Sequence, residues 1–151
     1  MIVYRLTKEK YKSDISGKGA ELYGARWNSK GTAILYTASN IALCMAETAV
    51  HVPFGILPKN YFLLKIFVPT DVAIKNIEKL PEDWNYNPPK IATKIIGDNF
   101  VRDNEYLLLK VPSAVVQGEF NYLINVRHPD YKLVNIQDTV PFQFDKRRFI
   151  K

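Results

Sequence analysis

The sequence predicts a single α+β domain, in which a mixed or antiparallel β-sheet is flanked by helices. Two observations support this fold class. Short apolar segments rich in β-branched and aromatic residues recur along the chain and dominate its second half, and one apolar segment has the length and boundaries of a helix. With 151 residues, 47% of them hydrophobic and 24% charged, the chain can bury an ordinary globular core. Residues 1–151 are therefore taken as one domain.

The first third of the chain contains two expected strands separated by a polar stretch. Residues 3–6 are expected to form a short strand, and residues 32–37 a second one because of their β-branched and aromatic content. Residues 8–24 are polar and glycine-bearing, which is typical of a loop that can include a helical turn.

A helix and a buried strand are expected next. Ser39 is the expected N-cap of a helix over residues 40–51, and Pro53 would end it. Residues 61–68 form a nearly continuous apolar run before Pro69, which predicts a central strand buried on both faces.

The second half is expected to hold one further helix and several strands. Residues 81–89 are expected to form an irregular connection, and Pro88 or Pro89 can open a helix that runs to about Asp103 with an interruption near Gly97. The remaining expected strands are residues 106–111, 114–116, 131–136 and 140–144.

Composition limits the cellular setting. The only cysteine, Cys44, excludes an internal disulfide, fits a reducing compartment and is expected to be a core thiol. The N-terminal residues 1–5 do not form a signal peptide, and no apolar run approaches the roughly 18 residues that span a bilayer. We therefore expect a cytoplasmic protein without membrane contact.

The net charge of +6 is compatible with nucleic acid, anionic nucleotides or an acidic partner. The lysines are scattered, and the tight basic cluster Lys146-Arg147-Arg148 stands near the C-terminus, where a solvated tail is the simplest interpretation. Charge alone leaves the partner open.

Glu47 is the most informative residue, because it is the single charge in the apolar segment 41–50. A buried carboxylate must become neutral, find a cation or line a cavity. The structural alternative is a carboxylate without a function, which reaches solvent at the edge of an apolar helix face. The functional alternative is stabilisation of an oxocarbenium-like state during cleavage of a glycosidic bond.

Two other segments offer polar groups in similar settings. Arg26 stands next to Gly24 and Trp27, so a guanidinium suited to phosphate or carboxylate lies beside a glycine and an aromatic ring. Tyr36 could stack on a flat ring or donate its hydroxyl. Ser113 lacks the setting of an activated nucleophile and is interpreted as a hydrogen-bonding residue.

Several familiar sites are excluded. One cysteine and two histidines do not make a zinc cluster, and no phosphate-binding glycine loop or dinucleotide fingerprint is present. His128-Pro129-Asp130 matches a J-domain signature, but its flanks are not the required helices.

Taken together, the motifs resemble the RES domain, the toxin component of RES–Xre toxin–antitoxin pairs, which is named for its Arg, Glu and Ser. The similarity covers nearly the whole chain in the family's order. The matching segments are Gly17-Lys18-Gly19-Ala20, Gly24-Ala25-Arg26-Trp27-Asn28, Leu35-Tyr36-Thr37-Ala38, Ala46-Glu47, Val111-Pro112-Ser113-Ala114, Asn121-Tyr122-Leu123-Ile124-Asn125 and His128-Pro129-Asp130.

The resemblance implies an ADP-ribosyltransferase-like fold and an attack on NAD. The implied reaction cleaves the nicotinamide–ribose bond, with inorganic phosphate as the expected co-substrate and ADP-ribose 1″-phosphate as product. NAD is then a substrate, and neither a metal nor a prosthetic group is expected. The alternatives are a mono-ADP-ribosyltransferase that modifies a protein and, from the charge, a nucleic-acid-binding or RNA-cleaving toxin.

The family's active-site positions match Arg26, Tyr36, Glu47 and Ser113. By this resemblance, Arg26 would hold a phosphate, Tyr36 would stack near the nicotinamide or its ribose, Glu47 would stabilise the oxocarbenium-like state, and Ser113 would orient ribose or phosphate. The further expected NAD-binding residues are Gly24, Trp27 and Asn125.

The resemblance also implies a cognate Xre-type antitoxin that blocks the active site, while the toxin itself makes no direct contact with nucleic acid. A homodimer within a larger toxin–antitoxin complex is compatible with it. The chain departs from the family pattern at Ala25, where a second glycine is common, and at Val126-Arg127, where the family tends to have a proline.

Overall fold

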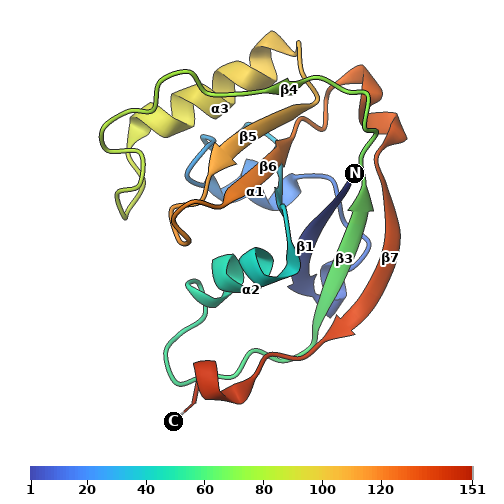
Figure 1. Ribbon diagram of the computed structural model, residues 1–151, viewed down its shortest axis with the longest axis vertical. Coiled ribbons are helices and arrows are strands. Elements are labelled where there is room, and N and C mark those ends of the chain that lie inside the picture. Colours follow the sequence, from blue (N-terminus) through green and yellow to red (C-terminus); the bar gives the residue numbers. More distant parts are fainter. Residues whose placement is uncertain (151) are drawn as a thin grey trace.

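The computed structural model describes residues 1–150, which form one seven-stranded sheet with three α-helices (Figure 1). The predicted α+β class is thereby confirmed. The strands are β1 (Ile2–Lys8), β2 (Leu35–Ala38), β3 (Tyr61–Phe67), β4 (Ile74–Lys75), β5 (Leu108–Pro112), β6 (Phe120–Ile124) and β7 (Asn135–Phe142), and the helices are α1 (Lys18–Tyr23), α2 (Ile41–Ala49) and α3 (Ile91–Asp103).

The strand order is β4-β5-β6-β2-β1-β3-β7, and every neighbouring pair is antiparallel except the parallel pair β4–β5. The sheet is split near its middle. All of β1 pairs with β3, whereas β1 pairs with β2 only where Tyr4 faces Ala38. Beyond that position β1 and β2 diverge. One half of the sheet (β1, β3, β7) is therefore only loosely joined to the other half (β2, β4, β5, β6), and Figure 1 shows the two parts side by side.

Most strand predictions are confirmed, and the errors have local causes. The strand at residues 61–68 is β3, but it is second from the edge rather than central, because β7 pairs along its outer side. Residues 114–116 form a bend instead of a strand, since the Ser113 hydroxyl accepts the N–H groups of Val115 and Val116. Strands β4 and β6 were not predicted, and residues 129–133 are a short 3-10 helix before β7.

The helix predictions need three corrections. The N-cap of α2 is Asn40 rather than Ser39, because the side-chain oxygen Oδ1 of Asn40 accepts the Leu43 N–H at 2.8 Å. Helix α3 passes through Gly97 without interruption. Helix α1, with six residues, is longer than the helical turn expected within residues 8–24, and Gly17 begins it in a left-handed conformation that suits glycine.

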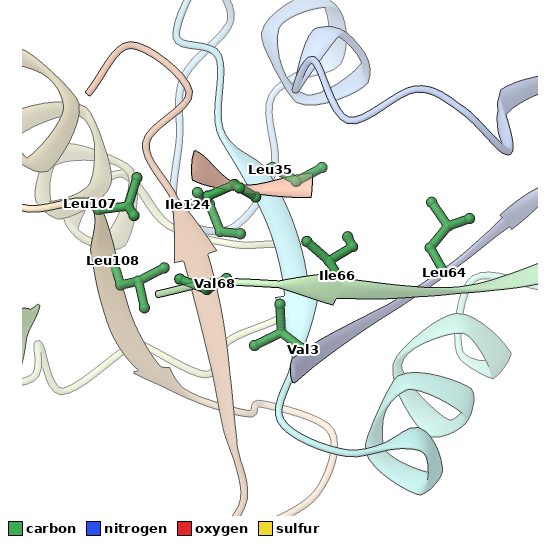
Figure 2. Packing of buried hydrophobic residues seen from close by; sticks show 9 residues of the cluster. Val3, Leu35, Leu64, Ile66, Val68, Leu107, Leu108 and Ile124 are labelled. Atoms are coloured by element: carbon green, nitrogen blue, oxygen red, sulfur yellow. The ribbon is translucent and has the colours of Figure 1, made fainter. Parts of the chain in front are cut away.

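The core consists of three clusters of buried side chains. The largest joins Val3, Leu35, Leu64 and Leu108 from four different strands, and Figure 2 shows these side chains with the other members of the cluster. A second cluster packs α2 against β1 and β3, and a third packs α3 against β5 and β6. Helices α2 and α3 therefore pack on separate halves of the split sheet, and neither fills the opening between the halves. Within residues 1–150, none of the helices has the length and apolarity to cross a bilayer.

Candidate active site

A cavity of about 590 Å³ lies where β1 and β2 diverge. Its walls come from α1, α2, β1, β2 and the start of β6, and its volume is in the usual range for a small-molecule site. Three residues expected from the sequence line it, namely Gly24, Tyr36 and Glu47. Arg5 and Asn121 also line it, although the sequence analysis did not assign them to the site.

Glu47 is held by two donors, one just after β5 and one in β6. Ser113 Oγ and Asn121 Nδ2 both donate to Glu47 Oε1, each at 2.7 Å. This geometry brings together Glu47 and Ser113, which come from distant segments of the chain. Both hydrogen bonds reach Oε1, and none from residues 1–150 reaches Oε2, so one carboxylate oxygen is available to a molecule in the cavity.

The backbone around Ser113 and Asn121 explains why these donors converge. Ser113 directly follows β5, and its Oγ accepts the N–H groups of Val115 and Val116 at 3.1 and 2.9 Å while donating to Glu47. Asn121 lies in β6 opposite Ala38 of β2, the strand that leads into α2. The turn fixes the serine and the strand register fixes the asparagine, so the carboxylate is oriented before any ligand binds.

Arg26 is held by backbone carbonyls rather than by side chains. Its Nη1 donates to the carbonyl oxygens of Trp84 and Tyr86 at 2.9 and 2.8 Å. Burial lowers the pKa of the guanidinium and the charge of Glu47 partly offsets this effect, so Arg26 stays cationic and lies within electrostatic range of the carboxylate. Arg26 does not itself line the cavity, although the adjacent Gly24 and Ala25 do.

Tyr36, in β2, connects the segment that carries Arg26 to the sheet. Its hydroxyl donates to Asn28 Oδ1 at 2.6 Å and accepts the Trp27 N–H at 3.1 Å. Asn28 is fully buried, and its Nδ2 donates to three carbonyl oxygens, including that of Ala20 in α1 at 2.8 Å. Burial raises the pKa of the Tyr36 hydroxyl well above its ordinary value, so Tyr36 is a neutral donor at physiological pH.

Arg5 is a cation that the sequence analysis missed. Its Nη1 donates to the Tyr36 carbonyl oxygen at 3.0 Å, at the point where β1 and β2 separate. Its Nε is buried and has no hydrogen-bond partner within residues 1–150. Burial lowers the pKa of Arg5, but an arginine remains charged in such a setting. A lone charge in the apolar first strand was the available signal, and it is the same signal that identified Glu47.

Four of the predicted site residues do not line the cavity, namely Arg26, Ser113, Trp27 and Asn125. Trp27 is 3% exposed and packs in the third core cluster, so only its backbone N–H takes part in the network. Asn125 is fully buried just beyond β6, where its Nδ2 donates to Asn104 Oδ1 at 2.8 Å and its Oδ1 accepts the Arg127 N–H at 3.0 Å. Neither side chain lines the cavity.

Cys44 also lines the cavity, as a buried thiol. Burial raises its pKa to about 12, so the thiol is protonated at physiological pH and is a poor nucleophile. No group of three or more histidine, cysteine, aspartate or glutamate side chains that could hold a metal ion occurs in the part of the chain that the structure describes.

This architecture, with a carboxylate fixed in the opening of a split sheet, is that of a known domain. The RES domain matches residues 2–145, and the chain belongs to that family. It is 38% identical over 150 residues to "Toxin Res" of Photorhabdus laumondii subsp. laumondii, covering 97% of this chain and 96% of that protein. It is 37% identical over 142 residues to "Prs ADP-ribosylating toxin" of Sphingobium sp., covering 91% and 88%. These relatives place the chain among the toxins of the RES family.

A solved structure has the same fold. A chain in the crystal structure of the M. tuberculosis MbcT–MbcA toxin–antitoxin complex matches with a TM-score of 0.75, covering 94% of this chain and 84% of that chain. The sequence identity is 21%, so this match establishes the shared fold.

Proposed function

We propose that this toxin cleaves the nicotinamide–ribose bond of NAD, with inorganic phosphate as acceptor. The observation that carries the proposal is the fixed carboxylate of Glu47, which points one oxygen at two donors and leaves the other open in a cavity of about 590 Å³. A carboxylate held in this way is suited to a transition state that develops positive charge on a sugar carbon.

In the proposed reaction, the bond between the anomeric carbon and the nicotinamide nitrogen breaks, and its electron pair leaves with nicotinamide. Glu47 stabilises the oxocarbenium-like state and binds the ribose hydroxyls through its open oxygen. A phosphate oxygen then bonds to the anomeric carbon, which gives ADP-ribose 1″-phosphate. The neutral nicotinamide needs no proton to depart, so the site does not require a general acid.

The two arginines supply positive charge for the anionic parts of the substrates. Arg5 lines the cavity and uses only Nη1 in a side-chain hydrogen bond among the described residues, and Arg26 stands behind the Gly24 wall with nitrogens beyond Nη1 still available. Guanidinium groups bind phosphate oxygens in a planar, often bidentate fashion. We therefore expect these residues to bind the pyrophosphate or the incoming phosphate, with Tyr36 beside the nicotinamide ribose and Ser113 acting through Glu47.

The test is an NAD consumption assay on purified protein with and without inorganic phosphate, with products identified by chromatography and phosphorus NMR. Glu47→Gln keeps the shape of the side chain and removes its charge, so turnover is expected to fall at least about 100-fold. Glu105→Gln, at an exposed carboxylate, is the matched control. Phosphate-independent loss of NAD would indicate a glycohydrolase, and intact NAD under both conditions would contradict the proposal.

A second candidate is transfer of ADP-ribose to a protein, and the Sphingobium relative named as an ADP-ribosylating toxin favours it. The same carboxylate would serve, and only the acceptor would differ. Label from NAD appearing on a protein, with little free ADP-ribose 1″-phosphate, would favour this alternative.

We further propose that the toxin acts in the cytoplasm and is held inactive by a cognate Xre-type antitoxin that covers the cavity. The solved structure with the same fold is a toxin–antitoxin complex, and the charge of +6 suits an acidic antitoxin segment. A homodimer within that complex stays a prediction. In the C-terminal basic cluster, which the sequence analysis interprets as a solvated tail, Arg147 is paired with Asp145 at 2.7 Å, and this pairing reduces the charge available to a nucleic acid.

A further inference from the structure

Helix α3 lies behind one wall of the cavity. Gly24 and Ala25 line the cavity and belong to a wall segment, residues 24–29, that also carries Arg26. Among the described residues, none from α3 lines the cavity. Any effect of this helix on a bound molecule must therefore pass through the wall segment.

Three side chains of α3 bond the backbone of the wall segment. Thr93 Oγ1 donates to the Arg26 carbonyl oxygen at 2.6 Å, and Lys94 Nζ donates to the Ala25 carbonyl oxygen at 2.9 Å. Asp98 Oδ1 accepts the Ser29 N–H at 2.9 Å. The two residues in each contact lie about 70 positions apart in sequence. Because the contacts are made to backbone atoms, they fix the path of the wall segment.

Gly97 brings the helix backbone itself against the wall. A Cβ atom built at Gly97 would lie 1.5 Å from the Trp27 carbonyl oxygen, so no other residue fits without movement. Gly97 stands four positions after Thr93 and Asp98 four after Lys94, a spacing that places all of them along one side of the helix. Glycine inside a helix is unfavourable, and this close approach accounts for its presence here.

We propose that this side of α3 (Thr93, Lys94, Gly97 and Asp98) positions the wall segment and thereby sets the affinity of the cavity for NAD. The four residues are positioning residues, since they act on substrate only through Gly24, Ala25 and Arg26. The choice of NAD as the ligand rests on the proposed function. The mechanical part of the inference, that α3 holds the wall in place, does not.

Thr93 gives the sharpest kinetic test, because two substitutions separate its hydroxyl from its volume. Thr93→Val has nearly the same shape but cannot bond the Arg26 carbonyl oxygen, so the KM for NAD is expected to rise about five- to tenfold while kcat changes less than about twofold. Thr93→Ser keeps the hydroxyl and is expected to retain the wild-type KM. Val134→Ala, in a different core cluster, is the control for a general loss of stability and is expected to leave KM unchanged.

A second readout does not depend on NAD. The chain has two tryptophans, Trp27 in the wall segment and Trp84. In a Trp84→Phe background, Trp27 is the sole tryptophan, and it is 3% exposed. Acrylamide quenching of its fluorescence is expected to increase about twofold in Thr93→Val and further in Gly97→Ala, while Val134→Ala remains at the background value.

The two readouts separate the two ideas. Unchanged KM and unchanged quenching in Thr93→Val would overturn the inference, as would a Thr93→Ser variant that behaves like Thr93→Val. Wild-type protein that leaves NAD intact would contradict the proposed function, and increased quenching would then still establish α3 as the support of the wall. If Gly97→Ala does not fold, the Thr93 pair decides the outcome alone.

Discussion

The carboxylate side and the arginine side of the cavity are held by different kinds of group. Side chains hold the carboxylate, since Ser113 and Asn121 both donate to Glu47. Backbone carbonyls hold the arginine, since those of Trp84 and Tyr86 accept from Arg26. Each charged group uses one atom for this anchoring and has another available for a ligand.

The difference shows what each side tolerates. The carboxylate depends on two residue identities, so single substitutions can reach it directly. The arginine depends on the path of the 81–89 connection and of the wall segment, which residue identity controls only indirectly. We therefore expect substitutions near Glu47 to act on turnover, and those around Arg26 to act on the position of a whole segment as well.

The largest effect in this comparison is expected from Arg26→Gln. The change removes the cation and the anchoring of the 81–89 connection together, so kcat/KM for NAD is expected to fall about 100-fold. Amide hydrogen exchange at residues 84–86 should accelerate at the same time, because the two carbonyls lose their donor and the connection loosens. Both quantities can be measured on the same preparation.

Arg26→Lys is the matched variant, since lysine keeps the charge but lacks the planar guanidinium. If Arg26→Lys keeps the amide exchange at residues 84–86 fast and restores little activity, the contacts with the two carbonyls require the geometry of the guanidinium and not only its charge. Wild-type kcat/KM in Arg26→Gln would contradict a role of Arg26 in binding substrate. Arg26 would then serve only to anchor the 81–89 connection.

The next largest effect is expected from the two donors to Glu47. Ser113→Ala removes the donor and also deprives the Val115 and Val116 N–H groups of their acceptor, so turnover should fall about tenfold and the unfolding free energy by about 1–3 kcal/mol. Asn121→Ala should lower turnover similarly with a smaller loss of stability. Initial rates and urea unfolding curves measure both.

The double variant sharpens this prediction. Both donors reach Glu47 Oε1, so the combined loss of turnover should be smaller than the product of the single losses. Independent, multiplicative losses would mean that the donors do not act on a common carboxylate.

The comparison also explains what the sequence could reveal of the site. Glu47 and Ser113 were identifiable because a polar residue in an apolar segment is a local anomaly. Asn121 was missed, since its contact with Glu47 depends on β6 pairing with β2, a strand that stands over 80 positions earlier. Arg5 was missed although it had the same local signature as Glu47.

The fold follows the same division between local and distant determinants. Helix α2 and strand β3 were predictable, because an apolar run and its boundary residues are local features. The bend after β5 was not, because one serine hydroxyl replaces the strand bonds of residues 114–116. The split between β1 and β2, which makes the cavity, depends on the whole sheet and has no signature in either strand.

The smallest predicted effect tests whether water is excluded from the arginine side of the cavity. Burial raises the pKa of Tyr36, whereas a tyrosine in the unfolded chain ionises near pH 10. Its contribution to stability is therefore fully present below about pH 10 and is lost above it, at up to about 1.4 kcal/mol per pH unit. Urea unfolding between pH 8 and about 11 should show a shallower alkaline decline in Tyr36→Phe than in wild type.

Cys44 and Tyr131, whose pKa values burial raises to about 12, contribute to the alkaline decline of both proteins and cancel in the difference. Tyr23→Phe, at a tyrosine that is 78% exposed, is the matched control and should decline like wild type. Equal slopes for wild type and Tyr36→Phe would mean that Tyr36 ionises in the folded protein. Water would then reach the hydroxyl that joins Trp27 to Asn28, and the arginine side would be a solvated rim instead of a fixed wall.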